Sequence, residues 1–185
     1  RLGKAGKLHY LWQSPFTLHQ RIVEAIQNET RLATEGKPAR IMAKMNALLE
    51  PDLIEELYAA SQAGVQIDLI VRGVCALRPG VPGLSENIRV RSVVGRFLEH
   101  SRVFTFANGS DDPLEGEYYI GSADWMYRNL SRRVEAVTPV RVRHLRERLW
   151  EDLVVQLEDR RNAWQMQSDG SYVQLRAEDG ASEVA

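Results

Sequence analysis

The first half of the chain alternates between short apolar runs and longer segments with helical spacing. Strand-like runs at 40–46 and 65–73 flank a segment that begins at Pro51 and ends at about Gln62 with the spacing of a helix. Another amphipathic segment, residues 17–34, precedes the first of these runs. A helix between two strands is long enough to return the chain to the same end of a sheet, so this order favours parallel strands covered by helices. We therefore predict an α/β fold.

The second half predicts further strands, because β-branched and aromatic residues again gather in short runs. The expected strands lie near 88–93, 102–107, 118–122 and 132–140. A polar turn between the second and third of them predicts a hairpin. Together with the first half, these strands indicate a mixed sheet.

The C-terminal part predicts one helix and one small hairpin. Residues 141–158 have amphipathic spacing. Its expected buried stripe consists of Leu145, Leu149, Leu153 and Leu157. A hairpin should follow around Asp169-Gly170, and we expect the tail, about 176–185, to be frayed.

Composition limits the range of functions. A length of 185 residues suits one domain, 1–185, and the formal net charge of −1 gives no general reason to expect nucleic acid as a partner. No apolar stretch is long enough to cross a bilayer. The single cysteine, Cys75, cannot form an internal disulfide, which favours the cytoplasm, and we interpret it as a small buried apolar residue. Because the first residue is Arg1 and not Met, we expect the sequence to be a piece of a longer protein.

The segment "FLEHSRVFTF" places His100 two residues before Arg102, at the mouth of a predicted strand. In an extended chain the two side chains project from the same face. An imidazole beside a guanidinium suits a phosphate, because one group can transfer a proton while the other neutralises oxygens. The structural alternative is a histidine at a strand end beside a solvated arginine.

Arg72 stands at the end of a predicted strand, where open α/β sheets bind ligands. The alternative is an edge arginine that pairs with an acid. Lys44 and Asn46, at the end of the preceding strand, could line the same edge or could face solvent. The long loop between Cys75 and Asn87 contains two prolines and two glycines, which favours a ligand-facing loop.

A second set of polar residues follows His100 in the chain. Gly121 and Ser122 are followed by Asp124, and Glu135 lies on the next predicted strand. Ser122 and Asp124 could also form only a turn and helix cap, and Glu135 could pair with a nearby arginine. The pattern resembles half of a phospholipase D superfamily site, with arginine and aspartate in place of the usual lysine and asparagine.

Three long stretches carry a more specific resemblance. The stretches "IVRGVCALRPGVPGLSENIRV", "RFLEHSRVFTF" and "IGSADWMYRNLSRRVEAVTPV" resemble the C-terminal domain of bacterial polyphosphate kinase. The resemblance implies a phospholipase-D-like mixed sheet flanked by helices. It also implies reversible transfer of the γ-phosphate of ATP to polyphosphate through a phosphohistidine, with Mg²⁺ as cofactor.

The resemblance also implies roles for individual residues. Arg72 matches an arginine that contacts the ATP phosphates, and His100 matches the second histidine of the active site. The remaining matches belong to the scaffold of a half-site, where Arg102 also binds phosphate; they are Arg102, Ser122, Asp124 and Glu135.

The histidine that becomes phosphorylated belongs to an upstream "HPYDSF"-type motif, which this sequence lacks. The resemblance therefore places the phosphohistidine and the Mg²⁺ ligands outside this chain, with no metal ligand within it. The implied partners are ATP or ADP, inorganic polyphosphate and the remaining domains of the same enzyme, in a homo-oligomer. Two alternatives stay open: a phospholipase-D-type phosphodiesterase completed by homodimerisation, and a module that only binds polyanions.

Overall fold

Nine strands form one mixed sheet in the computed structural model, which describes residue 8 and residues 10–176. The strands are β1 (Trp12–Ser14), β2 (Arg40–Met45), β3 (Gln66–Val71), β4 (Ile88–Val93), β5 (Val103–Phe106), β6 (Glu117–Gly121), β7 (Glu135–Pro139), β8 (Ala163–Met166) and β9 (Tyr172–Gln174). The helices are α1 (Leu18–Thr34), α2 (Pro51–Gln62) and α3 (Arg143–Glu158), with a 3₁₀ turn η1 (Pro113–Glu115) and a π-helical turn η2 (Arg128–Arg132). The predicted α/β class is confirmed.

Parallel strands form the centre of this sheet. The strand order is β1-β7-β6-β5-β2-β3-β4-β8-β9, and only the β2–β3 and β3–β4 pairs are parallel. Helix α2 makes the crossover between β2 and β3, as the sequence predicts. All other neighbouring strands pair in antiparallel fashion, including β2 with β5, β5 with β6, and β6 with β7.

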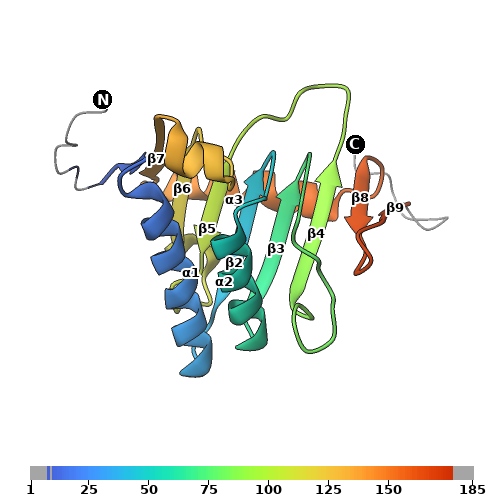
Figure 1. The fold of residues 1–185 in the computed structure, drawn as a ribbon, viewed down its shortest axis with the longest axis horizontal. Helices are drawn as coiled ribbons and strands as arrows, with labels where there is room; N and C mark the ends of the chain where they lie inside the picture. Colours follow the sequence, from blue (N-terminus) through green and yellow to red (C-terminus); the bar gives the residue numbers. More distant parts are fainter. Residues whose placement is uncertain (1–7, 9, 177–185) are drawn as a thin grey trace.

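The sheet is covered on both faces. Figure 1 shows α1 and α2 on one face and α3 on the other. On the first face, the predicted stripe of α1 is buried at Leu18, Ile22 and Ile26 and packs with alternate residues of the central strands. A smaller apolar cluster lies on the second face, where Leu153 of α3 meets Met42 of β2. The core is therefore two unequal layers on one sheet.

Helix α3 departs from the predicted burial. Of the expected stripe, only Leu153 is buried, and Leu145 is 45% exposed. The first turn of α3 is held by polar contacts instead: Arg143 pairs with Glu115 of η1, and the Nε of Arg146 donates to the carbonyl of Val140 over 2.8 Å. Because these arginines fix the start of the helix, its apolar packing begins only further along.

The segment between β3 and β4 is a crossover connection without a helix. Leu77 is fully buried, the backbone N–H of Arg78 donates to the Tyr58 hydroxyl, and Gln62 of α2 donates to the carbonyl of Gly83. The loop thus covers the sheet beside α2 (Figure 1). Only its first residues lie at the carboxyl end of β3, so most of the loop that we expected to face a ligand packs against the fold.

The small C-terminal hairpin is confirmed. Strands β8 and β9 pair around Gly170, whose φ of +89° is the left-handed conformation that glycine adopts without strain. Of the tail expected to be frayed, residues 177–185 lie outside the described part of the chain. None of the described helices combines the length and the apolar character that a membrane crossing requires.

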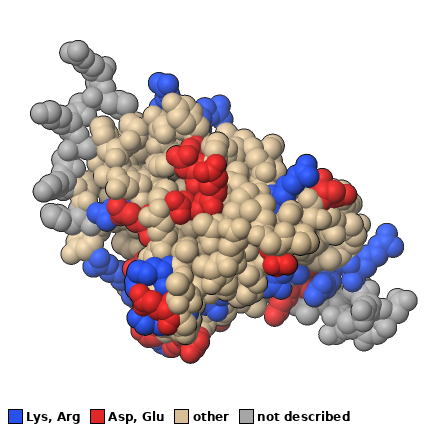
Figure 2. Space-filling model, turned by 60° about the horizontal axis from the view of Figure 1, so that its bottom comes forward, with Lys and Arg blue, Asp and Glu red and all other residues tan. Residues whose placement is uncertain are grey.

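Charged side chains of both signs are intermixed on the face in Figure 2. At the C-terminal end of α1, for example, Glu35 pairs with Arg31 over 2.5 Å and with Lys37 over 2.7 Å. Exposed pairs of this kind contribute little to stability, because water and salt screen their charges. They do keep basic groups there from forming a continuous positive surface.

Candidate functional site

The residues singled out in the sequence converge at one end of the sheet, where its parallel strands β2 and β3 finish; we call this end of the strands the edge. Strands β2, β3 and β6 end there, whereas β5 and β7 begin there, because the latter two run in the opposite direction. The edge therefore collects side chains from five strand ends. They are Asn46, Arg72, Arg102, Ser122, Asp124 and Glu135, and His100 lies just before β5 in the loop that arches over this edge.

Arg102 and Asp124 form a bidentate ion pair at the centre of this edge. Arg102 donates from Nε to Oδ1 and from Nη2 to Oδ2 of Asp124, each over 3.1 Å. Both side chains are nearly buried, with exposed fractions of 12% and 10%. The remaining nitrogen of the guanidinium, Nη1, donates to the backbone carbonyl of His100 over 3.0 Å. Arg102 therefore links Asp124 to the segment that carries His100.

Asp124 also reaches the neighbouring strand end. Its Oδ1 accepts from the backbone N–H of Asn46 over 2.7 Å and from the Asn46 side chain over 3.2 Å. The amide oxygen of Asn46 in turn accepts from Nε of Arg72 over 3.1 Å. A continuous chain of hydrogen bonds thus runs from Arg102 through Asp124 and Asn46 to Arg72.

Arg72 differs from Arg102 in its partners. Among the described residues, no carboxylate pairs with Arg72, and its Nη atoms have no hydrogen-bond partner. The alternative interpretation, an edge arginine paired with an acid, is thus not what the structure has. Its positive charge remains available to an anion at the carboxyl end of β3.

Close backbone packing sets the distance between these strand ends. The N–H of Arg72 donates to the carbonyl of Met45, and that of Gly73 to the carbonyl of Asn46, over 3.2 and 2.9 Å. A Cβ atom on Gly73 would lie 2.8 Å from the same Asn46 carbonyl oxygen. Glycine at this position therefore allows the loops after β2 and β3 to touch.

His100 lies in an arch, residues 94–102, that connects β4 to β5 above the edge (Figure 1). The side chain is exposed. The neighbours on either side of His100 are anchored by Lys44, whose Nζ donates to Glu99 over 2.9 Å and to Ser101 over 2.6 Å. Lys44 is only 4% exposed, so the sequence-based alternative that it faces solvent is wrong.

Ser122 and Glu135 form a second polar group on this edge. The Ser122 hydroxyl donates to Glu135, and the Asn129 amide donates to the other carboxylate oxygen over 2.8 Å. Ser122 also accepts from the backbone N–H of Ala136 over 3.2 Å. Glu135 is thus engaged by a hydroxyl and an amide, and no arginine pairs with it among the described residues.

Asp124 is ionised under ordinary conditions. Burial alone raises its pKa, but the hydrogen bonds from Arg102 and from the backbone N–H of Asn46 outweigh it, and the pKa lies below its usual value. An ionised carboxylate only accepts hydrogen bonds. Each group that forms a hydrogen bond with Asp124 must therefore present a donor to it.

Trp125 and Cys75 have structural roles, although Cys75 is only partly buried and not buried as the sequence suggested. Trp125 is fully buried and packs on Phe104, with ring centroids 5.1 Å apart. Burial raises the pKa of the Cys75 thiol to about 11, so the thiol is not a nucleophile at neutral pH.

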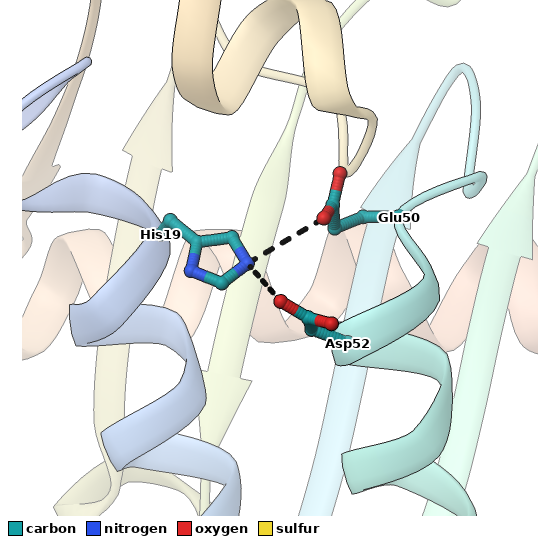
Figure 3. A group of neighbouring side chains, drawn as sticks. All are labelled: His19, Glu50 and Asp52. Carbon is teal, nitrogen blue, oxygen red and sulfur yellow. Dashed lines mark ion pairs between the residues drawn. The ribbon is translucent and has the colours of Figure 1, made fainter.

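A histidine lies between two carboxylates at the starts of α1 and α2. Figure 3 shows Nε2 of His19 facing Glu50 and Asp52, at 3.6 and 3.5 Å. These three form the one group in the described part of the chain that could surround a metal ion. The other oxygen of Glu50 is buried without a partner but points away from His19 in Figure 3. We interpret the group as a polar contact that joins the starts of the two helices.

The edge residues do not fit a magnesium site. Mg²⁺ requires several open oxygen ligands in octahedral geometry. The carboxylates of Asp124, Glu135 and Glu99 already accept hydrogen bonds from basic, hydroxyl or amide groups. We therefore derive no step of the chemistry through a metal held by this edge.

Asn46 and Lys44 are the contributors whose roles the sequence left open. The signal that could have identified Asn46 is its register. Met45 pairs with Val71 in the parallel ladder, so the next residues, Asn46 and Arg72, must be neighbours. For Lys44, the signal was a charged residue inside an otherwise buried strand, "RIMAKM".

The mixed sheet covered by helices on both faces is the architecture of a phospholipase-D-like α/β domain. The fold is similar to that of Nuc, a phospholipase D family member from Salmonella typhimurium, with a TM-score of 0.60 and 16% identity over 85% of this chain and 97% of Nuc. At this identity the similarity concerns the fold alone.

More specific similarities identify the family. Residues 11–185 match the family model described as polyphosphate kinase C-terminal domain 2, and the chain belongs to this family. It is 63% identical over 178 residues to polyphosphate kinase of Burkholderia multivorans and 57% identical over 185 residues to that of Neisseria meningitidis serogroup B. These matches cover 95% and 99% of this chain but 25% and 26% of the relatives, so the chain spans about a quarter of their length.

A solved structure supports the same assignment. The crystal structure of polyphosphate kinase from Porphyromonas gingivalis superposes with a TM-score of 0.91 at 36% identity, over 99% of this chain and 27% of that chain. The resemblance noted in the sequence is therefore confirmed. So is the predicted phospholipase-D-like fold.

Proposed function

We propose that this domain forms the phosphate-facing wall of a polyphosphate kinase active site, where the γ-phosphate of ATP is transferred reversibly to polyphosphate. The observation that carries the proposal is Arg72, a guanidinium at the carboxyl end of β3 whose charge no described carboxylate offsets. Uncompensated charge at such an edge favours a phosphate ligand. The family of the chain is consistent with that ligand.

The proposed mechanism divides the chemistry between this domain and another part of the enzyme. A histidine outside this chain takes the phosphoryl group. Arg72 offsets negative charge on ATP and on the polyphosphate chain, and the imidazole of His100 donates a hydrogen bond or a proton to the group in transfer. Phosphoryl transfer depends mainly on such positioning and electrostatic stabilisation.

The remaining edge residues support this arrangement. Arg102 is also proposed as a phosphate ligand, although its nitrogens are engaged by Asp124 and by the carbonyl of His100, so a phosphate would have to share them. Ser122, Asp124 and Glu135 act as scaffold. We propose that the Mg²⁺ ligands lie outside this chain, that the enzyme is cytoplasmic because ATP is its substrate, and that it is a homo-oligomer.

Substitution of His100 in a full-length polyphosphate kinase that contains this domain tests the proposal. His100→Ala should lower polyphosphate synthesis by about 100-fold or more, the usual contribution of an acid–base group. His100→Gln keeps hydrogen bonding without proton transfer, so intermediate activity would indicate that a hydrogen bond suffices.

His144, an exposed histidine on α3, provides the matched control. His144→Ala should leave synthesis unchanged. Thermal unfolding of each variant reports whether the fold is intact. A folded His100→Ala enzyme with normal synthesis would rule out the assigned role.

A further inference from the structure

We propose that Asn46 is a positioning residue for phosphate binding, because it holds Arg72 by Nε and leaves the outer nitrogens of the guanidinium for the ligand. The inference rests on the proposed role of Arg72. It adds a residue that would not touch the substrate itself. The supporting features are the orientation of the Asn46 amide, the neutrality of its contact with Arg72, and the rigidity of the two strand ends.

The orientation of the Asn46 amide is fixed by Asp124. The ionised carboxylate only accepts hydrogen bonds, so the amide must present Nδ2 to it, which it does over 3.2 Å. The amide oxygen then faces the opposite way, toward Arg72, and Nε of Arg72 can only donate. With the amide flipped, its oxygen would face the Asp124 carboxylate, so two acceptors would meet. Its nitrogen would face Nε of Arg72, so two donors would meet.

The contact with Arg72 holds the side chain without neutralising it. Two other arginines of the sheet pair with acids: Arg102 with Asp124 and Arg89 with Asp68, over 3.1 and 2.7 Å. Asn46 offers a neutral oxygen instead. Arg72 is thus oriented while its full charge and its two Nη atoms remain for phosphate oxygens, which a guanidinium binds in a bidentate manner.

The backbone beneath this pair leaves little room for movement. Parallel pairing continues past the strand ends through the hydrogen bond from Gly73 to the Asn46 carbonyl, 2.9 Å long. A fixed spacing between Asn46 and Arg72 preorganises the guanidinium before the ligand arrives. Preorganisation of this kind lowers the entropic cost of binding.

A double-mutant cycle in full-length polyphosphate kinase tests the inference. Asn46→Ala should raise the KM for ATP by about tenfold, the effect expected of one hydrogen bond to a charged group, and should change kcat less. Arg72→Ala should raise the KM more. When Arg72 is already alanine, Asn46→Ala should add less than about twofold, because residues that act through one another are not additive.

Asn87 offers a matched control at the opposite edge of the sheet. Like Asn46 it is partly buried and makes two side-chain hydrogen bonds, to the Ser61 carbonyl and from Gln66, over 2.8 and 3.1 Å. Asn87→Ala should lower the thermal midpoint to a similar extent and leave the KM for ATP unchanged. An equal rise in KM for this variant would mean that loss of stability, not positioning, explains the Asn46 effect, and would overturn the inference.

The cycle also separates the inference from the function on which it rests. If the fold-changes in KM of Arg72→Ala and Asn46→Ala multiply in full in the double variant, Arg72 binds phosphate but Asn46 does not act through it. In that case only the inference fails. If Arg72→Ala leaves both KM and kcat unchanged, the proposed role of Arg72 fails and the inference fails with it.

Discussion

Asp124 accepts hydrogen bonds from a guanidinium, a backbone N–H and a side-chain amide, so its negative charge holds three strand ends together. Its lowered pKa gives this charge a measurable effect on stability. For an acid whose folded-state pKa is depressed, the stabilisation is present above the unfolded pKa and is lost as the pH falls through the folded value. For aspartate, that loss begins below about pH 4.

We expect Asp124→Asn to destabilise the domain by about 3 kcal/mol at neutral pH, because it leaves the nearly buried Arg102 without a counter-charge. The difference from the wild-type protein should shrink as the pH falls below about 4, where Asp124 itself becomes protonated. Urea unfolding at a series of pH values measures both effects.

Asp68→Asn is the matched control, since it removes the same kind of bidentate pair from an arginine that is 63% exposed. Water can solvate Arg89 after the change, so the loss should be clearly smaller. A pH-independent difference between wild type and Asp124→Asn would contradict the assigned ionisation.

How far the sequence predicts the site depends on the kind of residue. His100, Arg72 and Asp124 stand in motifs that the sequence alone singles out as candidates. Asn46 does not, because an amide that acts through another side chain has no motif of its own. Lys44 was open for a related reason: its partners, Glu99 and Ser101, approach it from more than fifty positions away.

Among the elements, the arch between β4 and β5 joins the scaffold to the predicted chemistry. Its last part carries His100, and Lys44 of β2 binds the residues before and after it. A lysine is costly to bury, so its 4% exposure indicates that these contacts stabilise its charge. Lys44 thus anchors the arch to the sheet.

Lys44→Met tests this anchoring. Methionine fills a similar volume, and the partner carboxylate of Glu99 is 50% exposed, so water can solvate it and no buried charge is left unpaired. We expect the thermal midpoint of full-length polyphosphate kinase to change little. Synthesis should fall by roughly tenfold, because the segment around His100 loses two hydrogen bonds that hold it.

Lys37→Met serves as the control, since Lys37 is exposed and, within the described part of the chain, forms an ion pair with Glu35 alone. It should change neither stability nor synthesis measurably. Normal synthesis by Lys44→Met would show that the arch does not need this anchor.

The bounds of the helices and strands were predicted more accurately than the burial and packing of these elements. The bounds of α1, α2 and the central strands follow the sequence pattern closely, because apolar periodicity and flanking glycine or proline residues act locally. Helix α3 was predicted, but its burial was not, because contacts of Arg143 with Asp112 and of Arg146 with Leu114, both distant in sequence, set how the helix lies. The same holds for the loop after Cys75, whose packing on α2 no local signal reveals.

At the scale of the whole molecule, the domain supplies one side of a proposed active site. We expect the 185-residue chain alone to retain no label from γ-labelled ATP and to make no polyphosphate, because it lacks the upstream histidine motif. Incubation with labelled ATP and Mg²⁺, followed by separation under alkaline conditions that preserve phosphohistidine, measures this.

Full-length polyphosphate kinase treated in the same way provides the positive control. Acid-labile label in stoichiometric amount on the isolated chain would instead make a local histidine the nucleophile. That result would favour the phosphodiesterase interpretation, in which two copies complete a site.

The residues of the candidate site lie at the ends of central strands, and this position determines which local opening motions can disturb them. Strands β2, β3 and β5 occupy the middle of the strand order, whereas three-residue strands lie at both margins. Marginal strands fray first in local opening, and central strands release their amide protons only when the whole unit unfolds. The Arg72–Asn46–Asp124–Arg102 chain is therefore tied to the slowest-exchanging part of the molecule, so it should persist through the small fluctuations that open β1 or β9 and disappear only in one cooperative step.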